Sequence, residues 1–225
     1  AQVSYEVCVK FTTAALDLLG GEEACWEFPQ EPSTAFPPRH RLAQELMFVH
    51  SKALYLVGDH ARSGDLMTKI RQHVEGDPMA VSAVLMQHSE LLCVTQKYPE
   101  SYAKAVDAIR ALGVDYPLEP TPETMMMSVG RAMQRIMAHT VEKLAAQPLV
   151  KDAKWQAVYR CLSRTITPAF FMPDCYFMTL LATGVELAID NGANGMIAPA
   201  LAFFAMTVQM LAQRKLAHAL RHSAR

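Results

Sequence analysis

The sequence predicts an all-α fold in which antiparallel helical hairpins stack in a row as an α-solenoid. A similar helix–turn–helix phrase occurs twice, about forty residues apart, at residues 53–66 and 91–106. The chain also combines a hydrophobic share of 51% with only 10 glycines in 225 residues, which is typical of packed helices and excludes general disorder. Because a single hairpin cannot bury its apolar face alone, its neighbours must supply the missing wall. We therefore expect an elongated array that offers an open flank to partners.

The first helix is predicted from Val3 to Leu19, and Gly20 and Gly21 end it. Its apolar residues recur at three- and four-residue spacing, which predicts a buried stripe. That stripe comprises Val3, Val7, Phe11, Ala14, Ala15, Leu18 and Leu19. The next segment, from Glu22 to Pro38, contains four prolines and is predicted to be a connector. We expect its aromatic residues Trp26, Phe28 and Phe36 to hold it against the stack.

The next four helices are predicted from apolar periodicity and from their end signals. The helix over 39–57 is expected to bury the stripe Leu42, Leu46, Val49, Ala53, and Leu56 or Val57. Gly58 ends this helix and Asp59 caps the helix over 60–74. Residues 76–78, Gly-Asp-Pro, provide a stop, a cap and a first-turn proline before two further helices. These are expected over 78–96 and 99–112.

The second half predicts four more helices after a connector that ends at Pro120. Thr121 and Pro122 start a helix that is predicted to reach Gln147, and Pro148 ends it. The others are predicted over 152–166, over 174–189 with Asp174 as cap, and after the turn at 191–195, with a linker from Pro168 to Pro173. The result is about nine helices without a strand. Their pairing gives hairpins at 39–74, 77–113, 121–166 and 174–213.

These elements predict three parts of the chain. They are an N-terminal helix with a proline-rich connector over 1–38, a helical-repeat array over 39–213 and a basic C-terminal helix end over 214–225. The first residues carry neither an initiator methionine nor a signal peptide, so we expect an excised piece of a longer protein or a processed terminus.

Charge and composition argue against several classes of partner. The 21 basic and 22 acidic side chains nearly cancel, so no overall field attracts nucleic acid or an anionic membrane. The longest apolar run, residues 196–211, is shorter than the roughly twenty residues that span a bilayer. Five cysteines without a C-x-x-C motif predict neither a disulfide framework nor a zinc site. We expect these cysteines to be reduced and the protein to be cytoplasmic.

Candidate chemical sites are few, because the sequence lacks phosphate-binding, zinc-protease and nucleophile-elbow motifs. His218 and His222 share a helical spacing that suits a metal ion, but no third ligand follows, so a solvated helix end is the favoured interpretation. Glu186 and Asp190 are four residues apart, which suits an acid–base pair or, as we favour, two solvated carboxylates. No catalytic residue, cofactor or metal site is predicted. The histidines that occur singly are expected to be satisfied surface or core imidazoles: His40, His50, His60, His73, His88 and His139.

Two further features allow an interaction role. The methionines of the sixth helix predict either an adaptable groove for partner helices or gap filling in the core, and gap filling is favoured. They are Met125, Met126, Met127, Met133 and Met137. The tail is a basic amphipathic segment that suits a membrane surface or a calmodulin-like partner, although a helix end that complements its own dipole is favoured. Its side chains are Arg214, Lys215, Arg221 and Arg225, with Leu211, Leu216 and Leu220.

Four segments together resemble a known family. They are the apolar helix end at 46–59, the segment K-Y-P-E-S-Y-A-K-A at 97–105, A-I-R-A-L-G-V-D-Y-P at 108–117 and G-V-E-L-A-I-D-N-G at 184–192. In order and spacing they resemble the tetratricopeptide-like (TPR-like) helical segment that follows the ATPase module in very large multi-sensor signal transduction kinases. Gly184, the proline-rich stretch 29–38 and the basic end 214–225 depart from that pattern. The likeness covers structural positions only, so it carries over no functional residue.

The resemblance implies a non-catalytic interaction or coupling segment of signal transduction, in contact with a protein partner or with neighbouring domains. We expect the partner to bind in a groove lined by the first helix of each hairpin. The alternative is a helical sensor that binds a small apolar ligand between helix layers, near Trp155, Phe170 and Phe171. A third possibility is an all-helical enzyme whose catalytic residues the sequence does not reveal.

Overall fold

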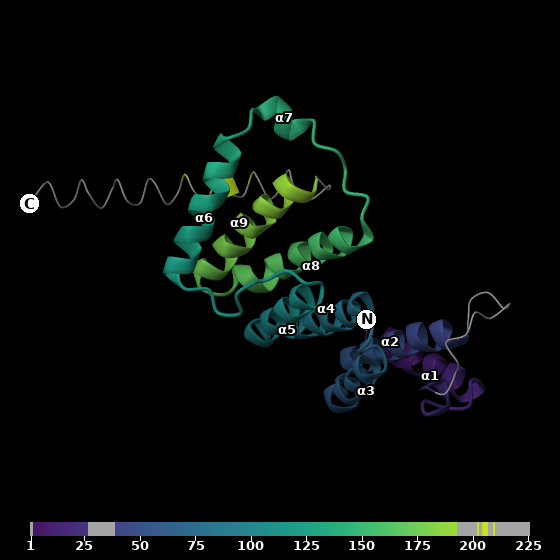
Figure 1. Ribbon diagram of the computed structural model, residues 1–225. Coiled ribbons are helices and arrows are strands. Elements are labelled where there is room, and N and C mark those ends of the chain that lie inside the picture. The colour runs from purple at the N-terminus through teal and green to yellow at the C-terminus, as the bar shows by residue number, and fades with distance from the viewer. Residues whose placement is uncertain (1, 27–38, 193–201, 203, 207–208, 210–225) are drawn as a thin grey trace, which may run out of the picture. The chain divides into compact units, whose positions relative to one another are not determined.

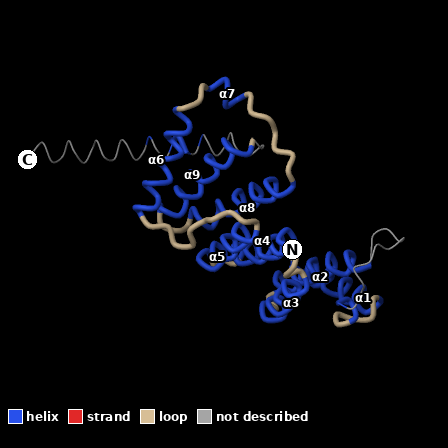
Figure 2. The backbone as a smooth tube through the Cα atoms, in the orientation of Figure 1, coloured by secondary structure: helices blue, strands red, loops and turns tan. Residues whose placement is uncertain are grey.

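The computed structural model describes residues 2–26 and 39–192, together with residues 202, 204–206 and 209. The secondary structure in this part of the chain is helical and contains no strand, as Figure 2 shows. The contacts divide the chain into two compact units, unit 1 over 1–91 and unit 2 over 92–225. The all-α prediction is therefore confirmed (Figure 1).

Unit 1 is organised around the helix α2. Its elements are α1 (Gln2–Leu18), the short 3₁₀ helix η1 (Ala24–Trp26), α2 (Arg39–Val57), α3 (His60–His73) and most of α4 (Pro78–Val94). The helix α2 packs against α1, α3 and η1. Gly58 ends it in the left-handed region at φ 98°, and the Asp59 carboxylate accepts a hydrogen bond from the Arg62 amide at 3.2 Å, which starts α3. These two ends are as the sequence predicts.

The core of unit 1 collects residues from all five elements. It comprises Leu16, Cys25, Ala43, Met47, Leu54, Tyr55, Leu66, Met67, Ile70, Val74, Val84 and Leu91. The Gln87 side-chain amide of α4 donates a hydrogen bond to the Phe48 carbonyl of α2 at 2.8 Å. A polar contact therefore supplements the apolar packing between α2 and α4.

The buried faces of α1 and α2 match the predicted stripes only in part. In α1 much of the predicted stripe lies outward, with Phe11 73% and Leu18 89% exposed, although Leu19 packs against the core; Thr12 and Leu16 are buried instead. In α2 most of the buried face lies one residue further along the chain than the predicted stripe, so that Leu42 and Val49 are exposed, whereas Ala53 is buried and Leu46 packs against the core as predicted. One residue turns a helix by about 100°. Because both helices carry apolar residues on two stripes, periodicity alone does not identify the face that packs.

Unit 2 places α9 between two other helices. Its elements are α5 (Tyr98–Ala111), α6 (Pro122–Met137), the short α7 (Val141–Ala145), α8 (Ala153–Phe170) and α9 (Asp174–Asn191). The helix α9 packs against both α6 and α8, and α8 also packs against α5. One core cluster joins α6 and α9 and comprises Val129, Ala132, Met178, Leu181, Ala182, Val185 and Phe204.

The predicted hairpin 121–166 is wrong, because α6 pairs with α9 instead of with α8. Arg131 of α6 donates a hydrogen bond to Glu186 of α9 at 3.3 Å, and Arg135 forms an ion pair with Asp190 one turn further. Apolar contacts and two ion pairs therefore hold α6 against α9. The long connection over 138–152 leaves α8 free to reach α5.

Two predicted helix ends in unit 2 are also wrong. The helix predicted to reach Gln147 ends at Met137, and Thr140 caps the separate helix α7 through the Lys143 amide at 3.3 Å. The helix α8 continues through Pro168 to Phe170, where a linker was predicted. Pro168 and Ala169 are buried there, and this apolar packing outweighs the loss of one backbone hydrogen bond.

Three further predictions concern the ends of the chain and its cysteines. Most of the predicted last helix and all of the basic end 214–225 lie outside the described residues. Within the described residues, no helix is long and apolar enough to cross a membrane. All five cysteines are free thiols, and only Cys25 and Cys161 are buried.

Candidate functional site

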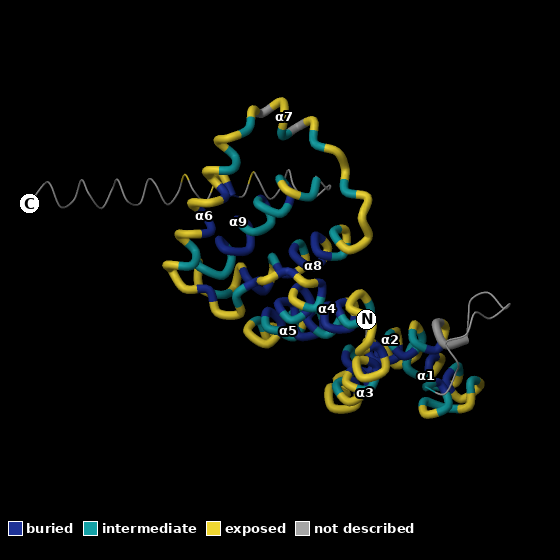
Figure 3. The backbone as a smooth tube through the Cα atoms, viewed as in Figure 1, coloured by how far each residue is buried: buried dark blue, intermediate teal, exposed yellow. Residues whose placement is uncertain are grey.

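The outer face of α6 carries an unburied stripe of methionine. Met126, Met133 and Met137 recur with Gly130 at spacings of four, three and four residues, which places all four on one face of the helix. Met126 is 47%, Met133 38% and Met137 80% exposed, and Figure 3 shows exposed residues along this helix. Met127 next to the stripe is exposed as well. We call Met126, Gly130, Met133 and Met137 the methionine stripe.

The favoured prediction for these methionines, gap filling in the core, is wrong for four of the five. Only Met125 packs, partly buried, against the α6–α9 core. That core occupies the adjacent face of α6, about 100° around the helix from the stripe, where Val129 and Ala132 are buried. The inward face is therefore already filled by smaller residues, and the remaining methionines extend away from it.

A cleft of about 530 Å³ opens in unit 2 between α6, α8, α9 and the loop after α5. Trp155 of α8 lines it, and the Lys154 ammonium lies 5.4 Å from the centre of the Trp155 ring. The other lining residues are mostly polar and include the charged side chains Asp115, Arg131, Glu186 and Asp190. This lining suits a polar ligand better than the small apolar ligand predicted from the sequence.

Glu186 and Asp190 are not two freely solvated carboxylates. Each forms an ion pair with an arginine of α6, and the Glu186 side chain is only 18% exposed. Their spacing therefore serves to join α6 to α9 along one wall of the cleft. Burial, and then the nearby Asp190 charge, raises the pKa of the Tyr159 hydroxyl to about 12. Tyr159 remains protonated and hydrogen-bonds to the carbonyls of Leu187 and Gly192 at 2.9 and 3.1 Å.

Phe170 and Phe171 do not belong to the Trp155 cleft. They lie at the other end of α8, about 22 Å from Trp155 along the helix axis. Both rings are exposed; Phe171 stacks on Tyr98 and Phe170 meets Phe177 edge to face. The three aromatic residues that the sequence assigned to one ligand site are thus at two separate places.

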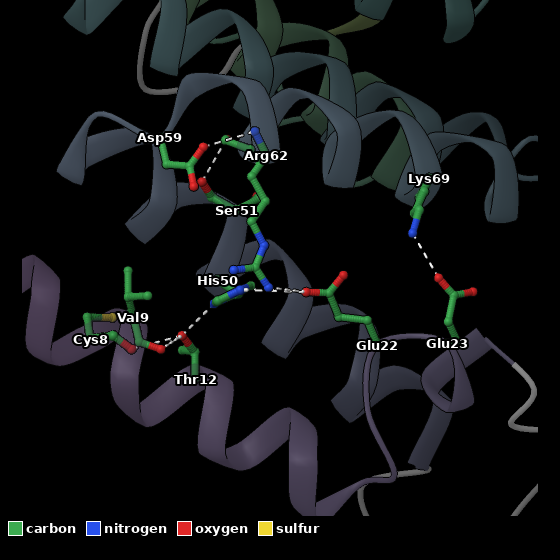
Figure 4. Close-up of polar contacts among 11 residues, drawn as sticks. Cys8, Val9, Thr12, Glu22, Glu23, His50, Ser51, Asp59, Arg62 and Lys69 are labelled. Atoms are coloured by element: carbon green, nitrogen blue, oxygen red, sulfur yellow. Dashed lines mark hydrogen bonds and ion pairs between the residues drawn. The ribbon is translucent and has the colours of Figure 1, made fainter.

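A buried histidine of unit 1 forms a polar contact between α1 and α2, shown in Figure 4. His50 of α2 has no exposed surface, and its Nδ1 lies 2.8 Å from the Thr12 hydroxyl of α1. The Thr12 hydroxyl donates to the Cys8 or Val9 carbonyl one turn earlier, at 2.8 or 3.0 Å. When the hydroxyl donates to one of these carbonyls, its oxygen accepts a hydrogen bond from Nδ1; when it donates to Nδ1, the ring proton lies on Nε2.

The other ring nitrogen of His50 faces an ion pair. Its Nε2 has no hydrogen-bond partner and lies 3.9 Å from a Glu22 carboxylate oxygen, which pairs with Arg62 at 3.0 Å. Burial, and to a lesser extent the Arg62 charge, lowers the pKa of His50, while Glu22 opposes the shift. The residue therefore remains neutral. It joins α1 to α2 and is closed to any substrate.

Several sequence-predicted residues cannot be placed. His218, His222 and the basic side chains of the tail lie outside the described residues. Within the described part, no three histidine, cysteine or acidic side chains converge as a metal ion requires.

Sequence reasoning missed both the polar lining of the cleft and the Thr12–His50 contact. The sequence did contain a signal for His50. This residue lies at helical spacing with the apolar residues Ala43, Met47 and Leu54, so it is the polar member of a face that is otherwise apolar. Asp115 gave no such signal, since it reaches the cleft only through the path of the loop. Comparison with family models, with curated proteins and with solved structures found no match to this chain.

Proposed function

We propose that this chain is a non-catalytic, TPR-like interaction or coupling segment of a cytoplasmic signalling protein. Its methionine stripe would bind an amphipathic helix of a partner protein or of a neighbouring domain. The observation that carries this proposal is the stripe itself, an apolar face on a helix whose adjacent face is already packed. Exposed apolar faces of this kind are typical of sites where proteins bind one another.

The shape of the stripe suits a helical partner. Its spacing repeats every seven residues, which is the pattern by which two helices meet along a seam. Gly130 adds no side chain, and a Cβ atom built there would contact nothing within 4 Å. A partner side chain can therefore enter between Met126 and Met133. Flexible thioethers adapt to partners of different shape.

The energy available from this face is moderate. Full burial of one methionine side chain contributes about 1.5–3 kcal/mol, so burial of the three partly exposed side chains contributes about 2–5 kcal/mol. This amount alone corresponds to a dissociation constant near the millimolar range, before the cost of association. We therefore expect reversible binding that depends on additional contacts around the stripe, as a coupling element requires.

The signalling context rests on the family resemblance of residues 46–59, 97–105, 108–117 and 184–192. The segment of that family is a non-catalytic helical array between an ATPase module and a sensor module. The all-helical structure and the packed hairpin of α2 and α3 support this assignment.

Display of amphipathic helical peptides against the immobilised full chain tests the proposal. Peptides selected on the wild type should bind the double variant M133E/M137E at least about tenfold more weakly, because both substitutions place a charge in the apolar seam. The control is Gln134→Glu, which adds one negative charge, half of that of the double variant, at an exposed position of α6 outside the stripe. Selected peptides that bind M133E/M137E as well as the wild type would contradict the proposal.

A further inference from the structure

The outer face of α1 forms a second apolar seam, in the other unit. Val7, Phe11, Ala14 and Leu18 recur at spacings of four, three and four residues, and all four are exposed. Val7 is 43% exposed, and Phe11 and Leu18 are among the most exposed large apolar residues of the described chain. We call these four residues the α1 seam. They follow the alternation of d and a positions of a coiled coil.

We propose that the α1 seam binds the α1 seam of a second copy of this chain, with the two helices antiparallel. This inference does not depend on the methionine stripe. The geometry points to self-pairing because the seam is complementary to itself in size and in charge when one copy is reversed.

The size argument follows from the antiparallel register. In that register each d residue meets an a residue of the other copy, so Phe11 lies opposite Ala14 at both central layers. Val7 then lies opposite Leu18 at both outer layers. A large ring beside a small side chain fills the central layers without a clash, whereas parallel helices would place the two Phe11 rings together.

The charge argument uses the flank of the same helix. Lys10 and Asp17 both precede an a residue of the seam, and both are exposed. In the antiparallel register Lys10 of one copy faces Asp17 of the other, and the symmetry of the pair repeats this contact. Asp17 lies at the C-terminal end of α1, where a negative charge opposes the helix dipole, so a lysine from the second copy stabilises it there.

The size of the contact sets the expected affinity. The 17 residues of α1 form a helix about 25 Å long, and one pair of such helices buries less than the roughly 1,200 Å² of a stable interface. We therefore expect a reversible dimer with a dissociation constant in the micromolar range or weaker. A large fraction of the chains would be dimeric where the local concentration of the chain is high.

Sedimentation equilibrium of the full chain from about 1 μM to about 1 mM tests the inference. The wild type should approach a dimer, and Phe11→Glu should remain monomeric because it places a carboxylate at both central layers. Lys10→Asp and Asp17→Lys should each weaken association about fivefold or more, because each creates two like-charge contacts. The combined variant K10D/D17K should restore it, since every contact again joins opposite charges.

Restoration by K10D/D17K is the decisive result, because a parallel pair or a partner of another kind does not predict it. The matched control is Lys52→Asp, a charge reversal at an exposed position of α2. Circular dichroism establishes that each variant is folded. A wild type that remains monomeric at about 1 mM, or association that is unchanged in K10D and D17K, overturns the inference and leaves the seam to another occupant.

Discussion

Replacement of Thr12 by valine should destabilise unit 1 through His50. Valine has nearly the shape of threonine but removes the hydroxyl that lies 2.8 Å from His50 Nδ1. Because His50 is fully buried and its Nε2 already lacks a partner, the variant leaves the imidazole without any hydrogen bond. A buried polar atom without a hydrogen-bond partner costs about 1–3 kcal/mol. The added methyl group returns less than about 1 kcal/mol, so we expect a net loss of about 1–2 kcal/mol.

Urea unfolding measures this loss when one tryptophan reports on unit 1. Trp26 belongs to unit 1 and Trp155 to unit 2, so a Trp155→Phe background leaves Trp26 as the reporter. The control is Thr13→Val, at the next position of α1, which should change the free energy of unfolding by less than about 0.5 kcal/mol. Trp26 stacks on His73 at 4.0 Å, so loss of this contact gives the fluorescence signal.

A double-mutant cycle separates the hydrogen bond from general damage to the core. His50→Leu should also destabilise the unit, but T12V/H50L should cost clearly less than the sum of the single variants, because both polar partners are then absent. Equal losses in T12V and T13V, or full additivity in the cycle, would refute the hydrogen-bond account.

Two further predictions use the same unfolding assay. Burial lowers the pKa of folded His50 from 6.5, so the unfolded chain binds a proton first as the pH falls. The free energy of unfolding of unit 1 should therefore decrease from about pH 6.5 down to the folded pKa, by at most about 1.4 kcal/mol per pH unit, and H50L should flatten this slope. In unit 2, Gly192→Ala should cost more than Gly113→Ala when Trp155 reports, and equal losses would contradict this. Both glycines have positive φ, but only at Gly192 would the new Cβ lie 2.8 Å from a backbone oxygen, that of Pro148.

The sequence predicted the helices of unit 1 well because local chemistry marks their ends. Gly58 with Asp59, and Asp77 with Pro78, place a left-handed stop, a cap or a first-turn proline at the boundary. Such signals involve only neighbouring residues, so the helix ends that they mark do not depend on how distant parts of the chain pack. The same holds for Thr121, which caps α6 through the Thr124 amide at 3.1 Å.

Long-range pairing was less predictable. The partner of α6 depends on Arg131 and Arg135 meeting Glu186 and Asp190, which lie 55 residues further along the chain. The connection over 138–152 is long enough for α6 to pair with either α8 or α9. The prediction of hairpins between consecutive helices favoured α8. The cleft could not be predicted for the same reason, since its walls come from α6, α8 and α9, whose pairing the sequence does not reveal.

The faces of α1 and α2 show a third limit, and it bears on both proposals. The buried side of unit 1 includes Thr12, His50 and Ser51, whereas Phe11 and Leu18 face outward. Polar residues in a core are tolerated when they are hydrogen-bonded, as Thr12 is to His50, but that bond does not explain why the more apolar side of α1 is exposed. Burial of Phe11 and Leu18 would contribute several kcal/mol, so this side of α1 is stabilised only when something covers it. The same reasoning applies to Met137 of α6. If F11E and M133E/M137E leave association and peptide binding unchanged, the two faces are ordinary surface, and both proposals fail on the same physical ground.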